Sequence, residues 1–300
     1  MTIADQAQAP AVSERVRSLV SHMTLDEKLS QLVGFWEGEA GDSVAPMQGE
    51  VSSTGKLDDA MVHGLGHLTR VYGTNPVEAD SRAEYLWQRQ RQLVKGTRLG
   101  IPALVHEECL TGLSAWKAAT FPAPLSWGAS FDPDLVERMG ALIDGSMRDL
   151  GIHQGLAPVL DVIRDARWGR VEECISEDPY VVGSIGTAFV KGVQSAGVDA
   201  TLKHFVGYSA SQSGRNFAPV HVGRRELQDE LLVPFEMAIL DGDAHSVMHS
   251  YAANDGVPVA ADASLLTGVL RDQWGFDGVV VADYFGVAFL MILQSVATDL

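Results

Sequence analysis

Residues 178–205 read DPYVVGSIGTAFVKGVQSAGVDATLKHF, a stretch that joins a predicted helix directly to a predicted strand. Asp178 is a favoured N-cap residue, and Pro179 suits the first position of a helix. Gly197 suits the helix end, and the apolar run from Val198 to Phe205 follows at once. A helix that leads straight into a buried strand is typical of parallel βα architecture.

The same alternation of strands and helices extends in both directions along the chain. Strands are predicted over residues 32–36, 65–72, 101–106, 152–160, 198–205, 246–249 and 278–283. Further helices are predicted over 133–150, after the N-cap Asp132, and over 224–240, where Pro234 should introduce a kink. These elements recur in βα units, and the chain has no G-x-G-x-x-G fingerprint of a doubly wound sheet. We therefore predict an α/β fold: one (β/α)8 TIM-barrel-like domain over residues 1–300 that ends before its eighth βα unit.

The composition excludes several classes of protein. The chain has 22 basic and 39 acidic residues, a net charge of −17, and such a surface repels nucleic acid. No apolar run reaches the ~18 residues of a membrane span, so no membrane partner is expected. The first residues, MTIADQAQAP, lack the pattern of a signal peptide, and we expect a cytoplasmic protein. Cys109 and Cys174 lack the spacing of a zinc site or a disulfide framework.

Polar residues gather where the predicted strands end, which is where barrel enzymes carry their chemistry. Five strand ends contribute: 106–108 (HEE), 161–164 (DVIR), 203–204 (KH), 248–251 (MHSY) and 283–284 (DY). We therefore expect these side chains to converge on one face of the sheet.

Each of these groups has a structural and a chemical interpretation. Asp283 follows VVVA (279–282), a strand apolar enough to be buried on both faces, so it either caps the next helix or serves as nucleophile or general base. Lys203 and His204 are either an ion-pairing device or donors for a polyhydroxylated ligand. The loop over residues 164–173 holds three arginines; most of it should be a solvated charge cluster, with at least one arginine facing the pocket.

Six ordered segments resemble one known family. They are ECLTG (108–112), TFPAPLSWGASFD (120–132), GLAPVLDVIRDARWGRVEECISEDPY (155–180), TLKHFVGYSASQSGRN (201–216), SVMHSYAANDGVPVAAD (246–262) and LLTGVLRDQWGFDGVVVADYFGV (265–287). Together they resemble the β-glucosidases and β-xylosidases of glycoside hydrolase family 3.

The resemblance implies a retaining exo-acting β-glycosidase that releases terminal non-reducing β-D-glycosyl residues through a covalent glycosyl-aspartate. The implied nucleophile is Asp283, in Ala-Asp-Tyr where the family usually has Ser-Asp-Trp or Ser-Asp-Tyr. The implied sugar-binding residues are Glu108, Arg170, Lys203, His204, Arg215, Met248 and Tyr251. No metal or organic cofactor is implied, and the substrate is a β-linked oligosaccharide or glycoside. Glucoside and xyloside specificity stay open.

Retaining hydrolysis also needs a second carboxyl group as acid/base. One branch of the family carries an Asp-His pair in a motif resembling KHFPGHG, and this chain reads KHFVGYSASQSG instead. Other members take the acid from a C-terminal α/β sandwich domain. We therefore expect an incomplete form whose acid/base lies beyond Leu300, and whose uncovered edge favours self-association into a homo-oligomer. A non-catalytic sugar-binding barrel and a metal-dependent barrel hydrolase remain the alternatives.

Overall fold

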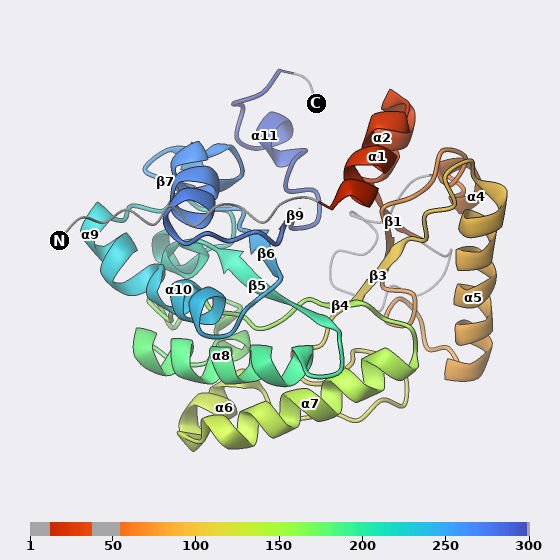
Figure 1. Ribbon diagram of the computed structural model, residues 1–300. Helices are drawn as coiled ribbons and strands as arrows, with labels where there is room; N and C mark the ends of the chain where they lie inside the picture. Colours follow the sequence, from red (N-terminus) through yellow and green to blue (C-terminus); the bar gives the residue numbers. More distant parts are fainter. Residues whose placement is uncertain (1–12, 38–54, 299–300) are drawn as a thin grey trace.

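The computed structural model describes residues 13–37 and 55–298, so most of the Gly- and Ser-rich loop from Gly38 to Lys56 lies outside the described residues. Its centre is a curled sheet of seven parallel strands in the order β1-β2-β3-β4-β5-β6-β9 (Figure 1). The strands are β1 (Gly34–Trp36), β2 (His67–Thr69), β3 (Leu104–Glu107), β4 (Gln154–Gly155), β5 (Asp199–Phe205), β6 (Ser246–His249) and β9 (Val279–Ala282). A short hairpin of β7 (Ala253–Asn254) and β8 (Val257–Pro258) follows β6. The predicted barrel-like fold is confirmed, and a strand lies within or overlaps each of the seven predicted ranges.

The helices lie around the outside of the curled sheet (Figure 1). They are α1 (Glu14–His22), α2 (Leu25–Ser30), α4 (Leu57–Ala60), α5 (Ala79–Gly96), α6 (Pro124–Ser130), α7 (Pro133–Asp149), α8 (Pro179–Gln194), α9 (Arg224–Glu226), α10 (Val233–Leu240) and α11 (Phe289–Ile292). The predicted N-caps are confirmed: Asp132 and Asp178 each accept a hydrogen bond from the third residue of the following helix. None of the helices in the described ranges is long and apolar enough to cross a membrane.

The predicted helix over 224–240 is interrupted, which corrects the expectation of one kinked helix. A π-helical segment (Leu227–Leu231) separates α9 from α10, and a second π-helical segment (Ser264–Gln273) precedes β9. Pro234 lies in the first turn of α10. Because a proline there gives up no intrahelical hydrogen bond, it marks the start of a new segment rather than a kink within one.

Two strand predictions also need correction. The fourth strand was predicted over 152–160, but β4 is only Gln154–Gly155. Pro158 has no N–H, so beyond β4 the regular ladder gives way to single backbone hydrogen bonds with β5, such as that from the Lys203 N–H to the Pro158 carbonyl at 3.1 Å, and to an isolated bridge between Val159 and Lys203. The strand before Asp283 was predicted to be buried on both faces, yet Val279 is 57% exposed. The reason is topological, because β9 is the last strand of the sheet and pairs only with β6.

The two outermost strands, β1 and β9, do not pair with each other in the described part of the chain. Both line a cavity of about 770 Å³ that also reaches the interior of the curled sheet. Side chains from β2, β3, β4 and β6 form its inner wall, among them His67, His106, Gln154 and Met248. Asp283, the first residue after β9, also lines this cavity.

Candidate active site

Asp283 lies at the end of β9 and is only 8% exposed. Its Oδ1 accepts a hydrogen bond from the Tyr284 backbone N–H at 2.8 Å, and its Oδ2 lies 3.8 Å from Nε2 of His204. Tyr251 contacts the same turn, since its hydroxyl donates to the Tyr284 carbonyl at 2.5 Å. Burial raises the pKa of Asp283, and the positive charges of Arg170 and Lys203 act against this rise. The cationic surroundings expected from the sequence are therefore present, and burial outweighs them.

Lys203 and Glu108 form a buried ion pair beside Asp283. Lys203, within β5, donates through Nζ to Oε2 of Glu108 at 2.8 Å, and its side chain is 4% exposed. Burial alone would raise the pKa of Glu108, yet the charges of Lys203 and Arg70 hold it below its usual value. An anionic acceptor and a cationic donor are thus fixed together, which suits a hydroxyl-bearing neutral ligand.

His204 is held from behind by Asp161, which follows β4. Oδ2 of Asp161 lies 2.8 Å from Nδ1 of His204 and also accepts the His204 backbone N–H at 3.0 Å. Tyr208 packs edge-on against the imidazole, with ring centroids 5.3 Å apart. Burial, together with the charges of Arg170 and Lys203, holds the pKa of His204 well below its ordinary value, so the ring is neutral.

Of the three arginines in the loop over residues 164–173, only Arg170 turns toward the site. Its guanidinium makes a bidentate contact with Glu173, at 2.7 and 2.8 Å, and lies 5.7 Å from the centre of the Tyr208 ring. Its charge acts on the carboxylate of Asp283 and on the ring of His204. Arg164 and Arg167 instead pair with neighbouring acidic residues near the surface. The expectation of one inward arginine among structural ones is met.

The structure brings most of the predicted site residues together, with one exception. Met248, at 4% exposure, lines the same cavity as Asp283. Arg215 is exposed, and its Nε donates to the carbonyl of Gln212. The preceding turn explains this placement, because Gly214 packs against the Trp168 backbone and leaves Arg215 facing solvent. In the described part of the chain, no hydrogen bond joins Arg215 to the other predicted site residues, and its role in sugar binding stays a prediction.

Two further groups lie near the site but were not among the residues predicted to bind sugar. Arg70, just after β2, is 8% exposed, and its charge lowers the pKa of Glu108. The ring of His106 joins His67, Nδ1 to Nδ1 at 3.1 Å, and the Tyr284 hydroxyl, 3.4 Å from Nε2. The predicted strand over 65–72 ran past Arg70 and so concealed it as a strand-interior residue; ending the strand at Thr69 would have placed Arg70 with the other strand-end residues.

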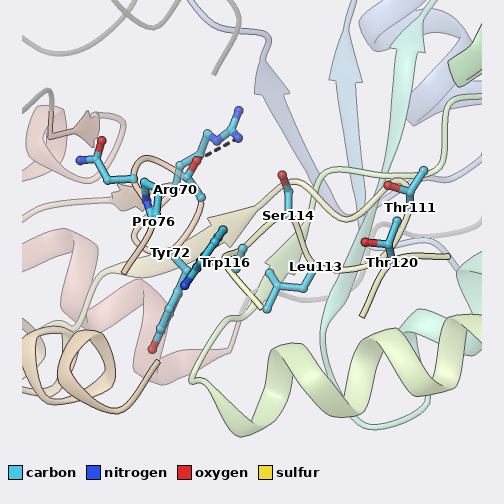
Figure 2. A pocket seen from close by; sticks show the side chains of 12 residues that line it. Arg70, Tyr72, Pro76, Thr111, Leu113, Ser114, Trp116 and Thr120 are labelled. Atoms are coloured by element: carbon cyan, nitrogen blue, oxygen red, sulfur yellow. Dashed lines mark hydrogen bonds between the residues drawn. The ribbon is translucent and has the colours of Figure 1, made fainter. Parts of the chain in front are cut away.

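A second, smaller hollow of about 300 Å³ lies beside Arg70, between the loops that follow β2 and β3. Figure 2 shows Tyr72, Trp116 and Ser114 around it, and the guanidinium of Arg70 donates to the Gly73 carbonyl at 3.2 Å. None of the residues predicted to bind sugar lines this hollow. The candidate site is therefore the cluster around Asp283 and not this second hollow.

Residues 13–37 and 55–298 contain no group of three His, Cys, Asp or Glu side chains placed to hold a metal ion. The site combines the buried carboxylates of Asp283 and Asp161 with cationic side chains, the imidazole of His204 and tyrosine phenol groups. Fold and site together define a βα-barrel domain with a buried carboxylate just after a strand, which is where barrel enzymes carry their chemistry.

Comparison with known proteins agrees with this class. Residues 24–299 match the model of the glycosyl hydrolase family 3 N-terminal domain. The chain is 33% identical over 295 residues to a putative β-xylosidase of Formosa agariphila, covering 95% of this chain and 38% of that protein. It is 30% identical over 290 residues to the periplasmic β-glucosidase of Salmonella typhimurium, covering 95% of this chain and 35% of that protein.

Solved structures show the same relationship. A β-glucosidase from Erythrobacter marinus superposes with a TM-score of 0.84 at 35% identity, covering 98% of this chain and 39% of that one. A β-glucosidase from Listeria innocua, in complex with isofagomine, superposes with a TM-score of 0.81 at 31% identity, covering 96% and 38%. The chain belongs to glycoside hydrolase family 3 and carries its N-terminal domain. It spans well under half the length of these relatives.

Proposed function

We propose that this domain serves a retaining β-glycosidase of the β-glucosidase or β-xylosidase type, with Asp283 as the nucleophile. The observation that carries the proposal is the setting of Asp283. Its buried carboxylate lines the 770 Å³ cavity, lies 3.8 Å from Nε2 of His204, and is acted on by the charges of Arg170 and Lys203. The names of the relatives, β-xylosidase and β-glucosidase, support a terminal β-D-glycosyl residue as the substrate.

The reaction proceeds in two displacements at the anomeric carbon. A carboxylate oxygen of Asp283 forms a bond to that carbon as the bond to the leaving-group oxygen breaks, and the leaving group departs with that electron pair. Water then attacks the same carbon as the glycosyl–Asp283 bond breaks. The electron pair of that bond restores the carboxylate, and the proton that the attacking water loses passes to the solvent. Two inversions give net retention. Glu108, Lys203 and His204 bind the sugar hydroxyls, while Arg170 and Lys203 favour the charged form of Asp283.

In the described part of the chain, no carboxyl group of the site is free to donate a proton to the leaving group. Glu108 pairs with Lys203, Asp161 with His204, and Glu173 with Arg170. We therefore propose that the 300-residue chain alone reacts with aryl glycosides, whose leaving groups depart without a proton, and turns over alkyl glycosides negligibly.

The test is pre-steady-state hydrolysis of 2,4-dinitrophenyl β-D-glucoside and β-D-xyloside. We expect a burst of dinitrophenolate equivalent to the protein present, a β-configured first product, and no burst from Asp283→Asn. Asp277→Asn, an exposed carboxylate shortly before β9, is the matched control and should keep the burst.

Three results would overturn the proposal. A full burst from Asp283→Asn would assign the nucleophile elsewhere. Saturable sugar binding with no burst would favour a non-catalytic sugar-binding barrel. Activity that EDTA abolishes and zinc restores would favour a metal-dependent hydrolase.

A further inference from the structure

Asp161 is buried behind His204, with 3% of its surface exposed. One oxygen, Oδ2, receives both the backbone N–H of His204 at 3.0 Å and the ring Nδ1 of the same residue at 2.8 Å. The backbone N–H of Ser209 donates to the carboxylate as well. Asp161 thus sits among N–H groups that only an acceptor can satisfy.

This environment decides where the proton of the His204 ring lies. Burial raises the pKa of Asp161 to about 7, against the backbone N–H groups of His204 and Ser209 and the charge of Arg170. At pH 8 the carboxylate is ionised and cannot donate, so the hydrogen between Asp161 and His204 belongs to Nδ1. A neutral imidazole carries one ring N–H, and Nε2 is then a bare acceptor. Nε2 is the atom that faces Asp283, with 3.8 Å between it and Oδ2.

We propose that Asp161 is a positioning residue that fixes His204 in the Nδ1–H tautomer, so that Nε2 accepts a hydrogen bond from a substrate hydroxyl beside Asp283. The inference rests on the proposed function, because the hydroxyl belongs to the sugar that Asp283 attacks.

The opposite tautomer would harm the site in two ways. An Nε2–H would point toward Asp283 and tie up a lone pair that the nucleophile needs. It would also meet a sugar hydroxyl as a donor rather than as an acceptor, while the bare Nδ1 would face the carboxylate of Asp161. Asp161 therefore determines whether Nε2 of His204 accepts a hydrogen bond from the sugar hydroxyl or donates one to it. It also determines whether Nε2 occupies a lone pair of the Asp283 carboxylate.

The chain offers a matched control for testing this role. Asp144, on α7, is fully buried and likewise accepts backbone N–H groups, from Ala196 and from Val198 at 3.2 Å, but it contacts no residue of the site. Asp161→Asn and Asp144→Asn each replace a buried acceptor by an amide of the same size. Loss of packing or of backbone anchoring should affect both variants alike, whereas loss of the tautomer affects only the first.

The experiment combines ¹⁵N-histidine NMR of the full chain at pH 8 with the rate of the dinitrophenolate burst. In the wild type, Nε2 of His204 should show the shift of an unprotonated nitrogen, assigned by its loss in His204→Gln. In Asp161→Asn that signal should move toward the protonated form, and the burst rate should fall by about 10- to 100-fold, the usual cost of losing a histidine's outer partner. Asp144→Asn should keep the wild-type Nε2 signal and, per folded molecule, a burst rate within about threefold of the wild type.

Several outcomes would overturn the inference. A protonated Nε2 in the wild type would do so even if Asp161→Asn failed to fold. Equal effects of the two substitutions on the burst would reduce Asp161 to a structural acceptor. Failure of the proposed function is distinguishable, because a wild type without any burst still reports the tautomer of His204 by NMR.

Discussion

At the scale of single residues, the pair of Lys203 and Glu108 shows how strongly the site depends on mutual compensation. The Lys203 side chain is 4% exposed and that of Glu108 23%, so neither charge is well solvated without the other. Removing one partner of a buried pair leaves the other charge uncompensated, which costs more than the pair itself contributes.

We therefore predict that Lys203→Met lowers the free energy of unfolding by about 2–4 kcal/mol, somewhat below the range for fully buried pairs because Glu108 is partly hydrated. The double variant Glu108→Gln/Lys203→Met should recover more than half of that loss, since no charge is then left unpaired. Urea unfolding of the wild type, both single variants and the double variant measures the coupling. Additive losses would show that the two side chains do not stabilise each other.

Glu107, next to Glu108, predicts a pH effect of opposite sign to that of most carboxylates. Its side chain is fully buried, and burial raises its pKa to about 8, against the backbone N–H groups of Tyr72 and Gly73 and the charge of Arg70. Because the folded state holds the proton more tightly than the unfolded state, this group stabilises the fold below its unfolded pKa. That contribution is lost as the pH rises toward 8.

We expect Glu107→Gln to gain stability relative to the wild type as the pH increases from 5 to 8, by at most about 1.4 kcal/mol per pH unit. The comparison between the two proteins removes the contribution of the buried histidines, which is common to both. Thermal or urea unfolding at several pH values measures the difference. A difference that is constant with pH would show that Glu107 is ionised throughout.

The residues that sequence could identify are those with a chemical signature at a strand end. That rule, together with the family motifs, identifies five residues that lie close together in the structure: Asp283, Lys203, His204, Glu108 and Arg170. Arg215 shares a motif with Lys203 but lies beyond a turn whose direction the sequence does not reveal. The role of Asp161 depends on how the chain after β4 packs beside β5, so its partner is not a neighbour in sequence.

At the scale of elements, α7 and α8 cross closely because glycines lie at the contact. A Cβ on Gly192 would lie 2.2 Å from the carbonyl oxygen of Glu137, and one on Gly140 would lie 2.9 Å from that of Phe189. These neighbours are backbone atoms, which cannot move aside as a flexible side chain would. The two glycines therefore permit the approach of two helices that also carry much of the outer core.

We predict that Gly192→Ala lowers the free energy of unfolding by about 2 kcal/mol or more, because the helices must separate or bend. Gly145, also on α7, has open space where a Cβ would lie, and Gly145→Ala should stabilise by about 0.5–1 kcal/mol through helix propensity. Chemical denaturation of both variants gives the contrast. Equal stability of the two variants would mean that α7 and α8 pack less tightly than the structure indicates.

The bounds of an element could be predicted well where residues at its own ends set them. They could be predicted poorly where pairing with another strand of the sheet sets them. The Asp-Pro starts of α7 and α8 carry their own capping atoms, and both helices begin as predicted. The short β4 depends on the N–H that Pro158 lacks, and the exposure of β9 depends on its place at the sheet edge. The π-helical segments have no simple sequence signal, so the sequence predicts one continuous helix over 224–240.

At the scale of the whole molecule, the net charge of −17 contrasts with a site that gathers Lys203, Arg170 and Arg70 inside the fold. The surface near β9 and α11 has a different character, with apolar side chains exposed to solvent. Val279 is 57% exposed and Ile292 59%, and Phe285 and Val287 lie between them in the chain. Such a surface favours association between copies of the chain.

We expect the chain to self-associate with increasing concentration. Val279→Lys should shift the equilibrium toward the monomer, because the charge of the lysine would lose its hydration on association. Leu142→Lys is the control. Leu142 is exposed on α7, which is distant in sequence from β9 and α11, and its substitution should leave association unchanged. Sedimentation velocity over a concentration series reports both. A purely monomeric wild type at every concentration would refute this expectation.

The proposed reaction requires a covalent bond between Asp283 and the sugar. Trapping this intermediate and locating the modified residue is the decisive experiment. The chain is incubated with 2,4-dinitrophenyl 2-deoxy-2-fluoro-β-D-glucoside, digested, and sequenced by tandem mass spectrometry. We expect one fluoroglucosyl unit per chain, located on Asp283 and absent from Asp283→Asn. A label on Glu108, Asp161 or Glu173, or no label after prolonged incubation with a ligand that demonstrably binds, would contradict it.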